Sequence, residues 1–107
     1  MASPIVKQPF EVIPVDFRFT GSLGPLEPDL VIESVDSIFA APSGDPDDLD
    51  FGDPLDWAIE GLVVQPIVSN GRHGVTYKAT CRINVVHAIT AKHYKFELDG
   101  SIVVRER

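Results

Sequence analysis

The sequence predicts an all-β fold, a small antiparallel immunoglobulin-like β-sandwich of about six to seven strands. Two segments, residues 75–87 and 94–105, alternate apolar and polar side chains with the two-residue period of a half-buried strand. Glycine, proline and asparagine recur at short intervals between apolar runs, and no segment has the 3.6-residue period that indicates a helix. Short strands joined by such turns are typical of two packed antiparallel sheets.

The chain has 107 residues, which predicts a single domain with one modest core. We expect an extended N-terminal arm over residues 1–9, which either drapes over a neighbouring molecule or is disordered, and one β-sandwich domain over residues 10–107. The net charge of −7 argues against direct binding to nucleic acid. No apolar run is long enough to span a bilayer, and the lone Cys81 excludes an internal disulfide framework.

The first two strands of the domain are predicted from the placing of their apolar residues. Within residues 10–20, alternate positions are apolar, namely Val15, Phe17 and Phe19. Pro14 breaks that alternation and indicates an edge position or a bend. After a turn region over residues 21–28, residues 30–40 are rich in β-branched side chains on both faces. We therefore expect the second strand to be central in its sheet or covered on its outer face by another chain.

Residues 42–56 form a long acidic loop that has no apolar periodicity. Loops of this length inside a small domain are usually functional or disordered. The aspartates that we select as candidate partner contacts are Asp45, Asp47, Asp48, Asp50 and Asp53. Their spacing fails the EF-hand pattern for calcium, because Leu49 and Asp50 stand where an acidic or amide residue and a glycine belong. The default is therefore a solvated acidic loop, and the alternative is a docking loop for a basic partner surface.

Residues 57–69 bring the chain back to the sheet. Trp57 is the single tryptophan, and it is either an anchor within the core or loop or an interface anchor. The apolar run that follows predicts a strand, and Pro66 within it indicates an edge position. Asn70-Gly71 is a strong turn signal that leads through Arg72 and His73 into the next strand.

The two long alternating segments are predicted to pair as a hairpin that turns at Thr90 and Ala91. This register sets Val85 opposite Phe96 and Arg82 opposite Asp99, and its buried face includes Tyr77, Ile83, Phe96 and Ile102. A slip by one residue would turn the apolar face towards water. A slip by two residues would keep both faces and is less firmly excluded.

No catalytic site, metal site or cofactor is predicted. No motif brings a nucleophile, a base and stabilising donors together, and no phosphate-binding glycine loop or paired-cysteine motif occurs. His87 and His93 flank the predicted turn but fall on opposite faces of the hairpin, so they do not converge on a zinc ion.

Several stretches of the chain share the pattern of one family of small virion proteins. They are Trp57, Gly61–Val63, Gly74–Tyr77, Cys81–Ile83 and the ending Ile102–Arg107, together with Leu30–Val35. On these residues the chain resembles the fiber-tail adaptors of short-tailed and related bacteriophages, over Phe17–Arg107 and mostly after Gly61. It departs from the family in its longer acidic loop and in a hairpin turn without the Gly-Arg common there.

The resemblance implies a structural virion protein of a phage tail, not an enzyme, that joins the tail tube or nozzle to fibers or spikes. It implies several copies around the tail axis, made in the host cytoplasm, with no nucleic-acid or membrane partner. The candidate contacts are Ile5 and Val6 in the arm, the acidic loop with Trp57, and Arg72 with His73. Another head-tail completion or decoration protein, a carbohydrate-binding β-sandwich module and a calcium-dependent domain remain open.

Overall fold

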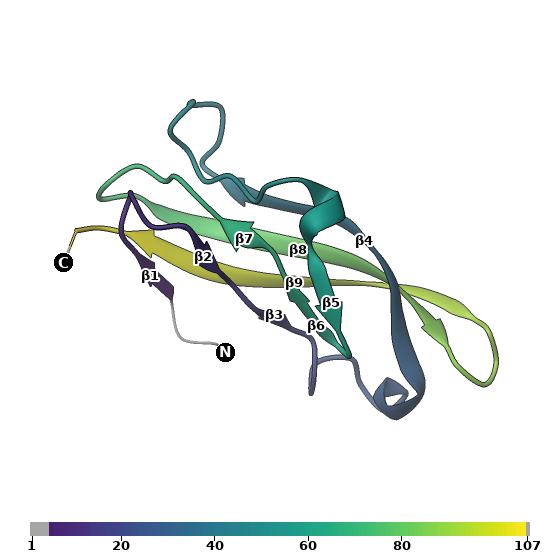
Figure 1. Cartoon of the computed structure of the whole chain (residues 1–107). Coiled ribbons are helices and arrows are strands. Elements are labelled where there is room, and N and C mark those ends of the chain that lie inside the picture. Colours follow the sequence, from purple (N-terminus) through teal and green to yellow (C-terminus); the bar gives the residue numbers. More distant parts are fainter. Residues whose placement is uncertain (1–4, 107) are drawn as a thin grey trace.

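The chain folds into a large β-sheet with shorter strands lying across one of its faces, in a computed structural model that describes residues 5–106 (Figure 1). The large sheet has the order β1-β9-β8-β4, formed by β1 (Ile5–Lys7), β9 (His93–Val104), β8 (Thr76–His87) and β4 (Leu30–Ala41). The second sheet has the order β3-β6-β5, formed by β3 (Phe17–Arg18), β6 (Val63–Gln65) and β5 (Ala58–Glu60). The third consists of β2 (Ile13–Pro14) and β7 (Ile67–Val68).

This strand content confirms the predicted all-β fold. The helical elements of the described residues are two short 3-10 turns, η1 (Glu27–Asp29) and η2 (Pro54–Asp56). In residues 5–106 we therefore find no helix with the length and apolar character needed to cross a membrane. The molecule is elongated, 47 × 27 × 20 Å, because three strands of the large sheet have 12 residues each.

The core lies between the large sheet and the shorter strands. It is one contiguous cluster of buried apolar side chains drawn from both layers. The predicted inward positions are confirmed for Tyr77, Ile83 and Ile102, whereas Phe96 is only half-buried. Cys81 is also buried, and burial raises the pKa of its thiol to about 12. The thiol is therefore a small core side chain at neutral pH and not a nucleophile.

The β8–β9 hairpin has the predicted faces, but its register lies two residues away from the predicted one. Arg82 lies opposite Glu97 and not Asp99, and Phe96 lies opposite Ile83 and not Val85. Both registers place the same side chains on the buried face, because a strand repeats every two residues. The alternation of apolar residues therefore could not distinguish them.

The turn that joins β8 to β9 explains the shifted register. The backbone N–H of His87 donates to the carbonyl oxygen of Lys92 at 2.8 Å, and the carbonyl of His87 accepts from the N–H of Ala91 at 2.8 Å. Nδ1 of His87 also accepts from the backbone N–H groups of Ile89 and Thr90, at 3.2 and 3.1 Å. The histidine side chain thus closes a turn centred one residue before the predicted Thr90-Ala91 pair.

The strand β4 lies at the edge of the large sheet, so the first of the two alternatives, a central strand, is wrong, and cover of its outer face by another chain stays a prediction. Its pairing with β8 shifts at two β-bulges, between Ile32 and Ser34 and between Val35 and Ser37. Two one-residue bulges restore the original alternation. The apolar residues opposite the inward side chains of β8 are Leu30, Ile32, Val35, Ile38 and Ala40. The bulges bring Val35 to the inward face, whereas Val31 and Phe39, which share its sequence phase, are exposed apolar side chains on the outer face.

The segment after Trp57 is a short hairpin followed by a change of partner, and the single edge strand predicted there is wrong. β5 and β6 pair around a two-residue turn that begins at Gly61, whose φ of +58° favours glycine. β6 lies between β3 and β5 and is therefore central in its sheet. Pro66 separates β6 from β7, and its carbonyl accepts from the N–H of Val15 at 3.1 Å. The proline ends one pairing and allows β7 to take β2 as its partner.

The segment predicted as an N-terminal arm includes β1, which pairs in parallel with β9 inside the chain's own sheet. Lys7 of β1 is fully buried, and its Nζ donates to the backbone carbonyls of Gln8, Pro9 and Asn70 at 2.9, 3.4 and 2.5 Å. Burial lowers the pKa of Lys7, against the opposing charge of Glu11. Residues 1–4 of the predicted arm lie outside the described residues.

Candidate functional site

Parts of the three regions predicted as partner contacts lie near one another towards the end of the molecule that holds β1 and the loop between β7 and β8, whereas η2, at the close of the acidic loop, lies nearer the middle (Figure 1). The acidic loop contacts the loop between β7 and β8, where the N–H of Gly71 donates to the carbonyl of Asp47 at 2.9 Å. The N-terminal segment reaches the same loop through the Lys7–Asn70 hydrogen bond. We call this surface, made of residues 5–9, 42–57 and 70–75, the acidic end.

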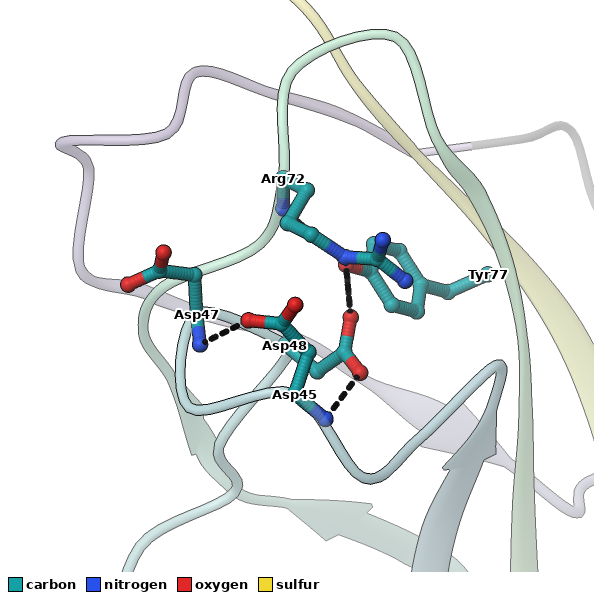
Figure 2. Close-up of polar contacts among 5 residues, drawn as sticks. All are labelled: Asp45, Asp47, Asp48, Arg72 and Tyr77. Carbon is teal, nitrogen blue, oxygen red and sulfur yellow. Dashed lines mark hydrogen bonds and ion pairs between the residues drawn. The ribbon is translucent and has the colours of Figure 1, made fainter.

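A buried carboxylate connects the two loops of the acidic end (Figure 2). The Asp48 side chain is 6% exposed, and its Oδ1 accepts from the hydroxyl of Tyr77 at 2.7 Å and from Nε of Arg72 at 2.8 Å. The Tyr77 hydroxyl in turn accepts from the backbone N–H of Arg72 at 3.0 Å. The second carboxylate oxygen of Asp48, Oδ2, accepts from the backbone N–H of Asp45 at 3.0 Å. Asp48 is therefore a structural link, and the expectation that the whole loop is solvated is wrong at this residue.

The remaining aspartates of the loop shape the backbone around them. Asp45, Asp50 and Asp53 each accept from a backbone N–H two residues later, at 2.9, 2.7 and 2.9 Å. Such turns occur where a short polar side chain replaces a backbone acceptor. Asp53 also caps η2 in this way. These side chains are exposed, as is Asp47, so the loop presents negative charge while its own carboxylates hold its shape.

Trp57 is half-buried at the base of the acidic loop, packed against the core. Its Nε1–H donates to the carbonyl of Phe51 at 2.7 Å, which satisfies the polar atom of the indole ring. A groove runs between this loop and the end of β4, lined by Phe39, Asp48, Leu49, Trp57 and Asn70 among others. The tryptophan is therefore a loop anchor that also forms one wall of a groove.

The other predicted contact residues are held within the same end of the molecule. Ile5 and Val6 pair with Ile102 and Val103 in the large sheet and are half-buried. His73 is exposed, and its Nδ1 accepts from the N–H of Glu106 at 3.2 Å. Sequence reasoning missed the Asp48–Tyr77 link, because the two residues are 29 positions apart and Tyr77 has the pattern of an ordinary core residue.

The acidic end offers charge and shape, with its carboxylates spread over separate turns. Within residues 5–106, no group of three or more histidine, cysteine, aspartate or glutamate side chains lies close enough to hold a metal ion. Each carboxylate that shapes the loop accepts from a backbone N–H of its own turn.

Stability at acid pH is expected to depend on Asp48. The hydrogen bond from Tyr77 lowers the pKa of this carboxyl, burial opposes the shift, and Arg72 adds to it. Because the folded pKa lies below the unfolded value of about 3.9, ionised Asp48 stabilises the fold above that pH. This stabilisation is lost as the pH falls through the folded pKa. Asp99, whose pKa is lowered chiefly by the Thr80 hydroxyl, acts in the same direction.

Urea unfolding measured from pH 6 to pH 2.5 tests this dependence. We expect the free energy of unfolding to fall below about pH 4, and to fall less in Asp48→Asn, which cannot be protonated there. Asp53→Asn removes the same charge from an exposed turn and reports the general effect of net charge. Equal pH dependence in the wild type and Asp48→Asn would contradict the assignment.

Comparison of the chain with protein-family models, with curated proteins and with solved structures found no match.

Proposed function

We propose that this chain is a structural protein of a bacteriophage tail that joins the tail tube or nozzle to fibers or spikes through its acidic end. The resemblance to fiber-tail adaptors suggests the role. The observation that supports it is that three segments far apart in the sequence meet on one surface with exposed carboxylates. As part of this proposal, the domain is an immunoglobulin-like sandwich that acts without catalysis, in the virion.

A surface of this kind is suited to docking because its loops are ordered before any partner arrives. The Asp48–Arg72–Tyr77 link and the aspartate-capped turns hold the acidic loop in one shape. A preordered loop loses less conformational entropy on binding. The exposed charges of Asp45, Asp47, Asp50 and Asp53 would speed association with a basic surface.

Several copies placed around the tail axis would make modest contacts sufficient. When copies are joined by a common ring, each further contact with a fiber or with the tube is intramolecular. The high effective concentration at the second contact then raises the overall avidity above the affinity of a single small surface. The long dimension of the domain would separate its acidic end from the β8–β9 turn at its other end (Figure 1).

The proposal is tested with a variant that removes charge and keeps the loop. Asparagine accepts a hydrogen bond as aspartate does, so it preserves the turns. The substitutions are Asp45→Asn, Asp47→Asn, Asp50→Asn and Asp53→Asn, with Asp48 retained. Binding is measured by surface plasmon resonance against the proteins encoded by the neighbouring genes, tail-tube and fiber proteins being the expected partners. We expect an association rate at least about tenfold lower at low salt.

The matched control removes four acidic charges elsewhere on the surface. Its substitutions are Asp16→Asn, Glu33→Gln, Asp36→Asn and Glu60→Gln, at exposed positions outside the acidic end. This control should bind as the wild type does. Equal losses in both variants would leave only net charge as the cause. Neighbouring genes without tail proteins, or glycan-array binding by the isolated domain, would overturn the proposed role itself.

A further inference from the structure

Within residues 5–106, one edge of the large sheet has no strand beside it over most of its length. β9 pairs with β8 along one side, from His93 to Val103, but on its other side β1 covers only Ile102–Val104. Among residues 5–106 no strand pairs with that side of β9 from His93 to Ser101. Proteins normally blunt or cover such an edge, because its unpaired peptide groups are a template for another strand.

The peptide groups on this open edge belong to the odd-numbered residues. The N–H of Val104 donates to the carbonyl of Val75 towards β8, whereas the N–H of Arg105 donates to Lys7 of β1 on the other side. Peptide groups alternate sides along a strand. The N–H and C=O groups of His93, Lys95, Glu97 and Asp99 therefore point to the open edge. If the added strand is β9 of a second copy, its own odd-numbered residues must lie opposite them.

The side chains along this edge are self-complementary in charge. On the outer face, His93 and Lys95 stand in the first half of the edge, and Glu97 and Asp99 stand in the second half. All four are exposed. Within the chain, Lys95 donates to the neutral side chain of Asn84 at 2.8 Å, whereas Glu97 pairs with Arg82 at 2.6 Å and Asp99 with Lys78 at 3.3 Å. His93 lies 3.6 Å from Glu33. These carboxylates and the imidazole stay exposed, so a second strand can still approach them. A second strand running in the opposite direction would thus present its acidic half to the basic half of the first.

We propose that two copies of the chain pair through this edge, antiparallel, about a two-fold axis at Phe96. Each Lys95 then lies opposite Glu97 of the other copy, and each His93 lies opposite Asp99. The odd-numbered residues of the two copies face one another, as their free peptide groups require. The paired span ends at Asp99, before Ile102, the first residue of β9 with which β1 pairs.

Charge selects this register from its neighbours. Moving the axis to residue 95 sets two lysines opposite each other, and moving it to residue 97 sets two glutamates opposite each other. An axis at residue 98 sets Glu97 opposite Asp99. Like charges directly opposite one another destabilise an antiparallel pair, whereas opposite charges stabilise it. Among these four registers, only the axis at Phe96 makes every charged pair attractive.

The inner face of the same edge supplies apolar surface. Tyr94, Phe96 and Leu98 point towards the core side but remain half-buried, at the rim of the core. In the proposed pair, Phe96 meets Phe96 and Tyr94 meets Leu98 across the axis, which removes apolar area from water. Aromatic cross-strand pairs of this kind stabilise a sheet.

The opposite edge of the sheet is a poor alternative for self-association. β4 contains two β-bulges, and bulges disrupt the regular spacing that an added strand needs. A two-fold pair through β9 uses the same patch on both copies and closes on itself, so it makes dimers and not filaments. This inference does not rest on the proposed tail function, because it depends only on the edge residues.

Charge reversal on the full chain tests the pairing. Sedimentation equilibrium is expected to show a reversible dimer for the wild type, and Lys95→Glu or Glu97→Lys alone should raise its dissociation constant by at least about tenfold. The double variant Lys95→Glu with Glu97→Lys restores opposite charges and should return to within about threefold of the wild type. Lys92→Glu, which changes a lysine outside the paired span, should have no effect.

Cysteine cross-linking tests the register independently of charge. Phe96→Cys brings two thiols together at the axis, where Cα atoms of a non-hydrogen-bonded pair lie about 4.5 Å apart, within disulfide range. Leu98→Cys on the same face leaves the thiols about 13 Å apart and should stay monomeric under oxidation. A wild type that stays monomeric at about 0.5 mM, a dimer indifferent to both reversals, or faster cross-linking of Leu98→Cys would overturn the proposal.

Discussion

Gly71→Ala is expected to destabilise the protein by about 3 kcal/mol, because it adds backbone strain to an overpacked contact. Gly71 has φ of +109°, a conformation that alanine rarely adopts. A Cβ there would lie 2.6 Å from Cγ2 of Val104 and 3.1 Å from Cδ2 of Leu49. Val104 is fully buried and cannot move aside cheaply. Thermal and urea unfolding measure the loss.

A second glycine in the same loop separates the two causes. Gly74 also has a positive φ, +82°, but a Cβ there would meet nothing within 4 Å. Gly74→Ala should therefore cost only the backbone strain, about 1 kcal/mol. If both variants lost the same stability, the close approach of Gly71 to Val104 would play no part. A Cβ at Gly71 would meet both Val104 of β9 and Leu49 of the acidic loop. The contrast between the two variants therefore also tests whether the acidic loop packs closely at this position.

Tyr77→Phe is expected to cost about 2–3 kcal/mol, or roughly 10 °C in Tm. The hydroxyl donates to the buried Asp48 carboxylate and accepts from the N–H of Arg72, so its removal leaves two polar groups short of a partner. Burial raises the pKa of Tyr77, so the hydroxyl remains a donor at neutral pH. Chemical denaturation followed by circular dichroism measures the change.

The matched control is Tyr94→Phe, at the other tyrosine of the chain. Tyr94 is half-buried on β9, and its hydroxyl makes no hydrogen bond to another residue within 5–106. This substitution should change stability by less than about 0.5 kcal/mol. Adding Asp48→Asn to Tyr77→Phe completes a double-mutant cycle, and we expect the two losses to be coupled because the residues share one hydrogen bond. Additive losses would mean that the bond contributes nothing.

The division between predicted and unpredicted features follows what side-chain alternation can report. Alternation identified the long strands and the inward faces of Val15, Phe17, Tyr77 and Ile83, because burial on one side of a pleated strand is a local property. It failed for the hairpin register, where a shift by two preserves the faces and the His87 turn makes the choice.

Bulges and changes of partner were likewise outside the reach of a local pattern. Two bulges shift the pairing of β4 with β8 and bring Val35 to the inward face, against the phase of Leu30 and Ile32. Pro66 was expected to mark an edge strand, but the strand before it, β6, lies between two neighbours. Only the assembled sheets specify which strand stands on each side.

The sequence by itself determined an all-β chain, the buried faces of its long strands and an acidic loop without a known metal motif, since composition and two-residue periodicity settle these. The tertiary structure alone decided that Asp48 is buried against Tyr77 and Arg72 while its neighbours stay exposed. It also decided that three distant segments are joined by hydrogen bonds and that, within residues 5–106, most of one side of β9 has no paired strand. These features depend on contacts between residues far apart in the chain, which no local pattern encodes.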